Sequence, residues 1–101
     1  MNPHLDPHLP AIRSLCCDYG VNSLQVFGSV LRHDFRPDSD IDLLVDFNES
    51  TATNAFQRFF GFKEAMEQLL GRPVDLITLK SIANPYFRRE LEESSQSLYA
   101  A

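Results

Sequence analysis

The sequence FGSVLRHDFRPDSDIDLLVDF, residues Phe27 to Phe47, is the segment around which the rest of the chain is organised. It contains the end of an apolar segment, a Gly-Ser turn, a basic segment and two aspartates separated by one residue. The run from Ile41 to Val45 is apolar and partly β-branched, which is typical of a buried strand. The segment from Ser23 to Phe27 has the same character. The sequence therefore predicts two short strands joined through a turn that carries most of the polar chemistry of the chain.

The two aspartates, Asp40 and Asp42, lie at the start of the second of these strands. Side chains at positions i and i+2 of a strand point to the same face, so the two carboxylates are expected to lie side by side. Like charges that close repel each other unless a cation lies between them, and hard oxygen ligands suit Mg²⁺ or Mn²⁺. By itself an Asp-x-Asp pair is more typical of a solvated strand end, but the neighbouring turn favours a metal site.

The turn between these strands has the residue types of a phosphate-binding loop. Gly28 allows close approach to the backbone, and a short helix beginning at Ser29 would present free N–H groups to a phosphate. The Ser29 hydroxyl adds a hydrogen bond, and Arg32 lies one turn further along with its positive charge. An ordinary turn is the alternative for the Gly-Ser pair considered alone. In combination with the aspartates, the sequence predicts a phosphate cradle that faces a metal-binding pair.

A further strand is expected from Pro73 to Thr78, where Asp75 interrupts an apolar run. An unpaired carboxylate in a central strand is costly to bury, so Asp75 needs a metal, a cation or solvent. An exposed aspartate on an edge strand remains the alternative from the residues alone.

Three amphipathic segments predict helices that pack on this sheet. They run from Leu9 to Tyr19 before Gly20, from Ala55 to Leu70 before Gly71, and from Tyr86 to Leu98 after Asn84 and Pro85. In the middle helix, Phe62 is interpreted as a residue left for a partner, while the other aromatic residues face the sheet. The predicted fold class is α/β, or α+β: a small mixed β-sheet flanked by helices.

The bulk properties predict one small globular domain over residues 1–101, with an irregular lead-in over residues 1–8. The formal charge is −5 and hydrophobic residues make up 44% of the chain. An acidic chain does not favour direct nucleic-acid binding, which depends on clustered Lys and Arg. The adjacent Cys16 and Cys17 are expected to be free, buried or half-buried thiols. Without an apolar run long enough for a membrane span or signal peptide, the expected location is the cytoplasm.

Gly28-Ser29-x-x-Arg32 followed by Ser39-Asp40-Ile41-Asp42-Leu43-Leu44-Val45 resembles the signature of the DNA-polymerase-β-like nucleotidyltransferase superfamily. The shortness of the chain makes it similar to the minimal nucleotidyltransferases, the MntA-type antitoxin partners of HEPN-domain toxins. The resemblance covers residues from about Leu24 to Thr78. It implies a polymerase-β-like fold.

The resemblance also implies roles for individual residues. Asp40, Asp42 and Asp75 would be the catalytic carboxylates that hold two Mg²⁺ ions, with Mn²⁺ as an alternative metal. Gly28, Ser29 and Arg32 would bind the nucleotide. ATP would be the substrate, and AMP would pass to a hydroxyl, expected to be that of a tyrosine, on a HEPN-type toxin.

Such a chain would act as the antitoxin of a type VII toxin–antitoxin system, in a hetero-oligomer with its toxin. Two other functions stay open from the sequence. One is an antitoxin that neutralises its partner by binding alone. The other is a small-molecule nucleotidyltransferase of the aminoglycoside-modifying type.

Overall fold

The computed structural model describes residues 5–28, 40–48 and 54–101, which form a mixed sheet with helices on both faces. The elements in chain order are the 3-10 helix η1 (Asp6–His8), α1 (Leu9–Asp18), β1 (Val21–Phe27), β2 (Ile41–Phe47), α2 (Ala55–Leu70), β3 (Val74–Thr78), the 3-10 helix η4 (Leu79–Ser81), α3 (Pro85–Ser94) and β4 (Gln96–Ala100). The expected fold class, a small mixed sheet flanked by helices, is confirmed.

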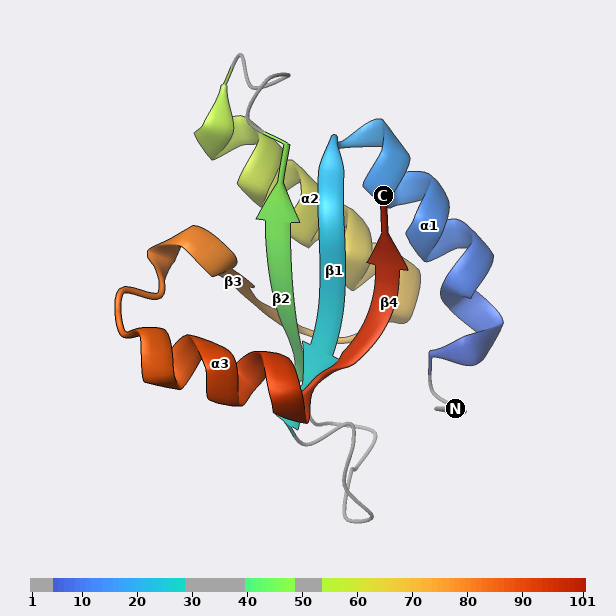
Figure 1. Cartoon of the computed structure of the whole chain (residues 1–101). Coiled ribbons are helices and arrows are strands. Elements are labelled where there is room, and N and C mark those ends of the chain that lie inside the picture. The colour runs from blue at the N-terminus through green and yellow to red at the C-terminus, as the bar shows by residue number, and fades with distance from the viewer. Residues whose placement is uncertain (1–4, 29–39, 49–53) are drawn as a thin grey trace.

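The order of the four strands across the sheet is β3-β2-β1-β4 (Figure 1). β1 pairs antiparallel with both β2 and β4, whereas β2 and β3 run parallel. A parallel pair needs a crossover connection, and α2 supplies it. Among the described strands, β3 and β4 therefore lie at the two edges of the sheet, and β3 pairs with β2 alone.

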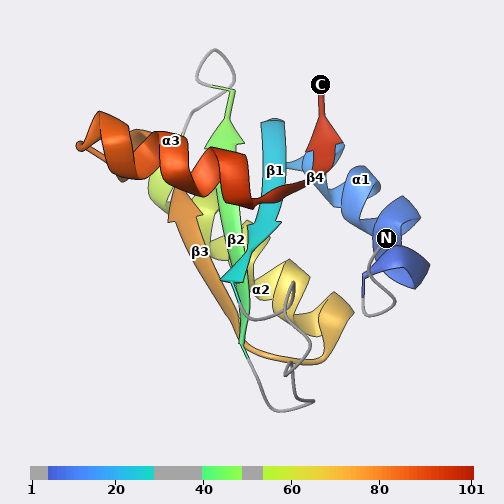
Figure 2. The same ribbon diagram turned by 60° about the horizontal axis from the view of Figure 1, so that its bottom comes forward.

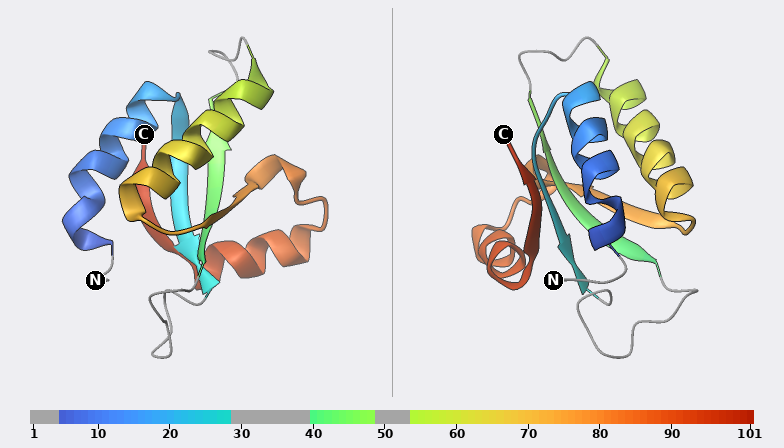
Figure 3. Two further views of the ribbon diagram at one scale, coloured as in Figure 1. Left: turned by 180° about the vertical axis from the view of Figure 1, so that it is seen from behind. Right: turned by 90° about the vertical axis from the view of Figure 1, so that its right-hand side faces the viewer.

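The helices divide the two faces of the sheet between them. α1 and α2 lie on one face and α3 lies on the other (Figure 3). In the turned view of Figure 2, α3 crosses its face of the sheet away from the start of β2. One face is thus closed by two helices, and the opposite face is only partly covered.

The hydrophobic core lies between the sheet and the α1–α2 layer. Alternate residues of β2, Ile41, Leu43 and Val45, are fully buried there. Phe62 and Met66 of α2, four residues apart and so on one side of the helix, contribute fully buried side chains from above. The intervening residues of β2, beginning with Asp42, consequently face the α3 side of the sheet.

The end of the chain differs from the expected helix over Tyr86–Leu98. α3 ends at Ser94, and residues 96–100 form β4 on the free edge of β1. The Ser94 and Ser95 hydroxyls donate hydrogen bonds to the Leu91 and Glu92 carbonyl oxygens at 3.3 and 3.0 Å, at the point where the backbone becomes extended. Leu98 is 5% exposed and belongs to the core, because pairing with β1 outweighs local helix propensity.

The expectation that Phe62 is left for a partner is wrong. Its side chain is fully buried, and its ring meets those of Tyr19 and Phe47 edge to face at centroid distances of 5.6 and 5.8 Å. Phe56 and Phe60 of the same helix are the exposed aromatic residues, 72% and 48% exposed.

The beginning of the described chain is more ordered than an irregular lead-in. Asp6–His8 form a 3-10 helix, and Leu5 is fully buried in the core. Of the two thiols, Cys16 is buried and Cys17 is exposed. Burial and the neighbouring Cys17 raise the pKa of the Cys16 thiol to about 12. None of the helices in the part of the chain that the structure describes has the length and apolarity to cross a membrane.

The burial of Phe62 predicts an asymmetry between two phenylalanines of α2. Phe62→Ala should lower the free energy of unfolding by about 3 to 5 kcal/mol, because it removes a buried ring and leaves a cavity. Phe56→Ala, the matched control on the same helix, should change it by about 0.5 kcal/mol or less. Urea unfolding of both variants measures the difference, and equal losses would contradict this packing.

Candidate active site

Asp42 and Asp75 lie side by side on neighbouring strands. In the parallel ladder between β2 and β3, Asp42 is the direct partner of Asp75, as Leu43 is of Leu76. Leu43 and Leu76 are buried against the helices, so both aspartates project from the opposite, α3 face of the sheet. Asp75 is exposed and Asp42 is half-buried. The structure therefore brings together two of the three predicted carboxylates, which are 33 positions apart in the sequence.

Asp40 lies immediately before β2 and is exposed. The next residue, Ile41, donates its backbone N–H to the Pro73 carbonyl oxygen at 3.0 Å, one residue before β3. This bond joins Ile41, which lies between Asp40 and Asp42, to the segment that precedes Asp75. Asp40 is thus held at the same end of the β2–β3 pair as the other two carboxylates.

Gly28 completes this end of the sheet from the other side of β2. It follows β1, whose last residue, Phe27, pairs with Asp42. Its φ of +77° is a left-handed conformation that glycine adopts without steric cost. A Cβ at this position would overlap Oδ2 of Asp42 and lie 3.1 Å from its Cγ. The Asp42 carboxylate therefore rests against the Gly28 backbone, in a space that any side chain at residue 28 would fill.

The remaining predicted nucleotide-binding residues, Ser29 and Arg32, lie outside the described residues. Within residues 5–28, 40–48 and 54–101, no three His, Cys, Asp or Glu side chains lie close enough to hold a metal ion. The donor set is nevertheless of the right chemistry: three carboxylates at one end of a parallel strand pair, next to a glycine backbone. Carboxylate oxygens are the ligands that Mg²⁺ and Mn²⁺ prefer.

Glu67 of α2 supports the start of β3, and sequence reasoning missed it. Its Oε2 accepts the backbone N–H of Val74 at 3.0 Å and pairs with Lys63 Nζ at 3.2 Å. The hydrogen bond from Val74, followed by that from Lys63, lowers the pKa of the Glu67 carboxyl. The only sequence signal was the i, i+4 spacing from Lys63, which is more often an ordinary surface pair.

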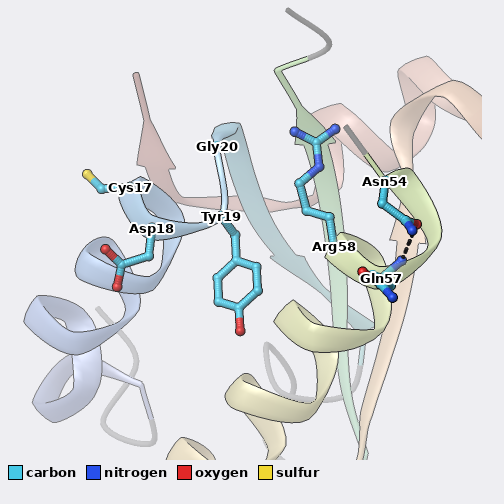
Figure 4. A pocket seen from close by; sticks show the side chains of 7 residues that line it. All are labelled: Cys17, Asp18, Tyr19, Gly20, Asn54, Gln57 and Arg58. Atoms are coloured by element: carbon cyan, nitrogen blue, oxygen red, sulfur yellow. Dashed lines mark hydrogen bonds between the residues drawn. The ribbon is translucent and has the colours of Figure 1, made fainter. Parts of the chain in front are cut away.

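A hollow of about 400 Å³ lies at the opposite end of the sheet from Gly28 and the aspartates (Figure 4). Its lining comes from the end of α1 with Gly20, and from the start of α2 with Asn54, Gln57 and Arg58. The Asn54 side chain caps α2 by accepting the Gln57 N–H at 3.1 Å, and Arg58 donates to the Asn48 carbonyl oxygen at 2.8 Å and stacks over Phe47. These polar groups are held by structural contacts, and the hollow contains none of the predicted site residues.

The sequence profile of the nucleotidyltransferase domain matches residues 9–98. The match covers the three α-helices, β1 to β3 and most of β4, and it includes the end of the sheet that carries Gly28 and the aspartates. The chain therefore belongs to the nucleotidyltransferase domain family, and it is a nucleotidyltransferase.

Within the nucleotidyltransferases, this chain is similar to proteins named as protein adenylyltransferases. The protein adenylyltransferase MntA of Thermococcus cleftensis is 37% identical over 75 residues, which is 74% of this chain and 73% of that protein. A Methanocaldococcus jannaschii relative, also named as a protein adenylyltransferase, is 43% identical over 75 residues, or 74% of each chain.

Solved structures agree with the fold. A minimal nucleotidyltransferase, 36% identical, superposes with a TM-score of 0.77 over 91% of this chain and 90% of that one. A toxin–antitoxin structure with AMP-PNP, 21% identical, has a TM-score of 0.70 over 92% of this chain and 73% of that one. At that identity the second likeness concerns the fold alone.

The contact between Gly28 and Asp42 predicts the effect of adding one methyl group. Gly28→Ala should cost about 1 to 2 kcal/mol of backbone strain at positive φ and should also displace the Asp42 carboxylate. Gly71→Ala is the matched control, because Gly71 has a φ of +70° but no atom within 4 Å of its added Cβ. Both variants should lose similar stability in urea, but only Gly28→Ala should lose nucleotidyl transfer. Equal activity in the two variants would show that Asp42 does not depend on this contact.

Proposed function

We propose that this chain transfers AMP from ATP to a hydroxyl group of a partner HEPN-type toxin, and that it acts as the antitoxin of that toxin. The observation that carries the proposal is the register of Asp42 with Asp75 beside Gly28, which sets two carboxylates next to a backbone position without a side chain at one end of the sheet. The relatives named as protein adenylyltransferases favour a protein as the acceptor. A related toxin–antitoxin structure contains a tri-AMPylated HEPN toxin with its MNT antitoxin.

The bonds that form and break in this reaction indicate a role for each residue of the site. The acceptor oxygen forms a bond to the α-phosphorus of ATP, and the bond from that phosphorus to the bridging oxygen breaks, so that pyrophosphate leaves. The acceptor hydroxyl loses its proton, and Asp75, exposed at the edge of the sheet, can accept it. A tyrosine is the proposed acceptor.

The phosphates lie, in this proposal, at the end of β1. Gly28 presents a backbone without a side chain to the triphosphate, and Ser29 and Arg32 add a hydroxyl donor and a positive charge, as the sequence indicates. Asp40 and Asp42 would hold Mg²⁺. When bound, the metal neutralises the triphosphate and lowers the pKa of the acceptor hydroxyl.

The absence of a three-carboxylate cluster in the described residues has a simple physical account. Like charges at one strand end repel, and the cation is the group that draws them together. Asp40 lies directly before β2 and Asp42 is the second residue of β2, so the two carboxylates are separated by one residue at the same end of the strand.

The proposal predicts a strict dependence on the first two aspartates. The chain is incubated with ATP, Mg²⁺ and the protein encoded next to it, and intact mass spectrometry measures adenylyl addition to that protein. Asp40→Ala/Asp42→Ala should show no addition while keeping the circular dichroism spectrum of the wild type. Asp46→Ala, a change at the far end of β2, should keep the addition.

Two results would contradict this prediction. Addition by the Asp40→Ala/Asp42→Ala variant at the wild-type rate would exclude these carboxylates as the catalytic pair. A tight complex without any addition by the wild type would make the chain an antitoxin that acts by binding alone.

Substitution of Asp75 should slow the transfer step without weakening ATP binding, because the proposed role of Asp75 is to accept a proton. Asp75→Asn preserves the size of the side chain and should lower the rate of transfer at saturating ATP by about 10²- to 10⁴-fold, the usual contribution of a general base. The affinity for ATP should change little, because the proposed phosphate contacts lie at the end of β1. Equilibrium binding of ATP together with the transfer rate checks this, and an unchanged rate would remove Asp75 from the mechanism.

A further inference from the structure

We propose that Glu67 is a positioning residue for Asp75: it fixes the start of β3 on β2 and thereby sets the position of Asp75 beside Asp42. The inference rests on the proposed transfer reaction for its effect on rate. Glu67 itself lies on α2, on the core side of the sheet, and touches neither aspartate.

Glu67 ties the connection from α2 to β3 at both of its ends. Its backbone carbonyl oxygen accepts the N–H of Gly71 at 2.9 Å, where the helix ends. Its carboxylate accepts the N–H of Val74 at 3.0 Å, where the strand begins. One residue therefore fixes both ends of a three-residue connection, and Val74 is the residue directly before Asp75.

The same connection contacts the first residue of β2, Ile41, which lies between Asp40 and Asp42. Pro73, inside the connection, accepts the Ile41 N–H at 3.0 Å, and Val74 is the register partner of Ile41. A continuous path of hydrogen bonds and covalent bonds thus runs from Glu67 through Val74 and Pro73 to Ile41. The path begins at a residue of α2 and ends at the backbone that carries Asp40 and Asp42.

The start of β3 needs such support because β3 is a short edge strand. It has five residues, and among the described strands it pairs only with β2, so no described strand lies on its outer side. A bond to an ionised carboxylate is stronger than one to a neutral acceptor. The Lys63–Glu67 pair contributes less, because each side chain is 32% exposed and the two lie on one helix. The contact with Val74 is therefore the one that matters.

A small displacement of Asp75 would be enough to slow the reaction. A shift of about 1 Å in a catalytic group can lower a rate by about 10²-fold, even when the substituted residue lies far from the reacting atoms. Loss of the Glu67 bond would release the β3 start while the core residues Val74 and Leu76 still pack. The expected result is a folded protein with a misplaced Asp75.

The test compares four variants of the full chain in the transfer reaction with its partner protein. Glu67→Ala removes the acceptor for Val74, whereas Glu67→Gln keeps an oxygen that can accept the same bond. Lys63→Ala removes the ion pair and leaves the Val74 contact in place. Glu64→Ala is the matched control, because Glu64 is an exposed glutamate of the same helix. Amide hydrogen exchange of Val74 and Ile41, measured by NMR, follows the structure without reference to activity.

Glu67→Ala should lower kcat by about 10- to 100-fold with KM for ATP within about twofold of the wild type. It should also increase the exchange rates of the Val74 and Ile41 amides, and Glu67→Gln should restore both quantities most of the way. Lys63→Ala and Glu64→Ala should resemble the wild type. Unchanged exchange at Ile41 in Glu67→Ala, or a Gln variant no better than Ala, would overturn the proposal.

The outcome stays distinct from that of the proposed function. A wild type that transfers no AMP would contradict the proposed function, and the exchange of Ile41 and Val74 would still decide whether Glu67 fixes the β2–β3 register. A wild type that transfers AMP, with a Glu67→Ala variant of equal kcat, would overturn the positioning role alone.

Discussion

The parallel pairing of β2 with β3 is the constraint on which the rest of the site depends. Its register makes Asp42 and Asp75 direct neighbours on one face, and shifting it by one residue would move Asp75 to the core side. The buried partners Leu43 and Leu76 prevent that shift, because it would expose apolar surface and bury a carboxylate. The hydrophobic core and the chemistry of the site are thus specified by the same alternation of residues.

The two faces of the sheet have separate tasks. α1 and α2 close one face and bury the core, including Phe62, whereas α3 contributes no buried residue of its own. Asp42 and Asp75 lie on the α3 face, and α3 crosses that face away from the start of β2 (Figure 2). Gly28 contributes to both the fold and the site. Its positive φ ends β1, and its missing side chain leaves room for Asp42. The packed layer of α1 and α2 therefore supports the opposite face of the sheet, which carries the carboxylates; functional sites are positioned best on regular elements of this kind.

Sequence patterns predicted the parts of the structure that depend on local chemistry. The apolar run before Asp46 predicted β2, and glycine predicted the ends of α1 and α2, where Gly20 and Gly71 have positive φ. β4 could not be predicted, since pairing with β1, about 70 residues away, converts an amphipathic segment into a strand. The burial of Phe62 depends on Tyr19 and Phe47, and the contact of Glu67 with Val74 forms only when α2 packs beside β3. Both are contacts between residues far apart in the sequence, so the pattern within one segment does not predict them.

Locating a divalent ion on the protein would test the assignment of the aspartates directly. Paramagnetic broadening of amide NMR signals by Mn²⁺, with AMP-PNP present, reports which residues lie near the metal. We expect broadening centred on Gly28, Asp40, Asp42 and Asp75, with the hollow near Gly20 and Asn54 unaffected. Broadening centred on that far end of the sheet, or spread over surface carboxylates without a centre, would contradict the assignment of these aspartates as the metal-binding, catalytic site.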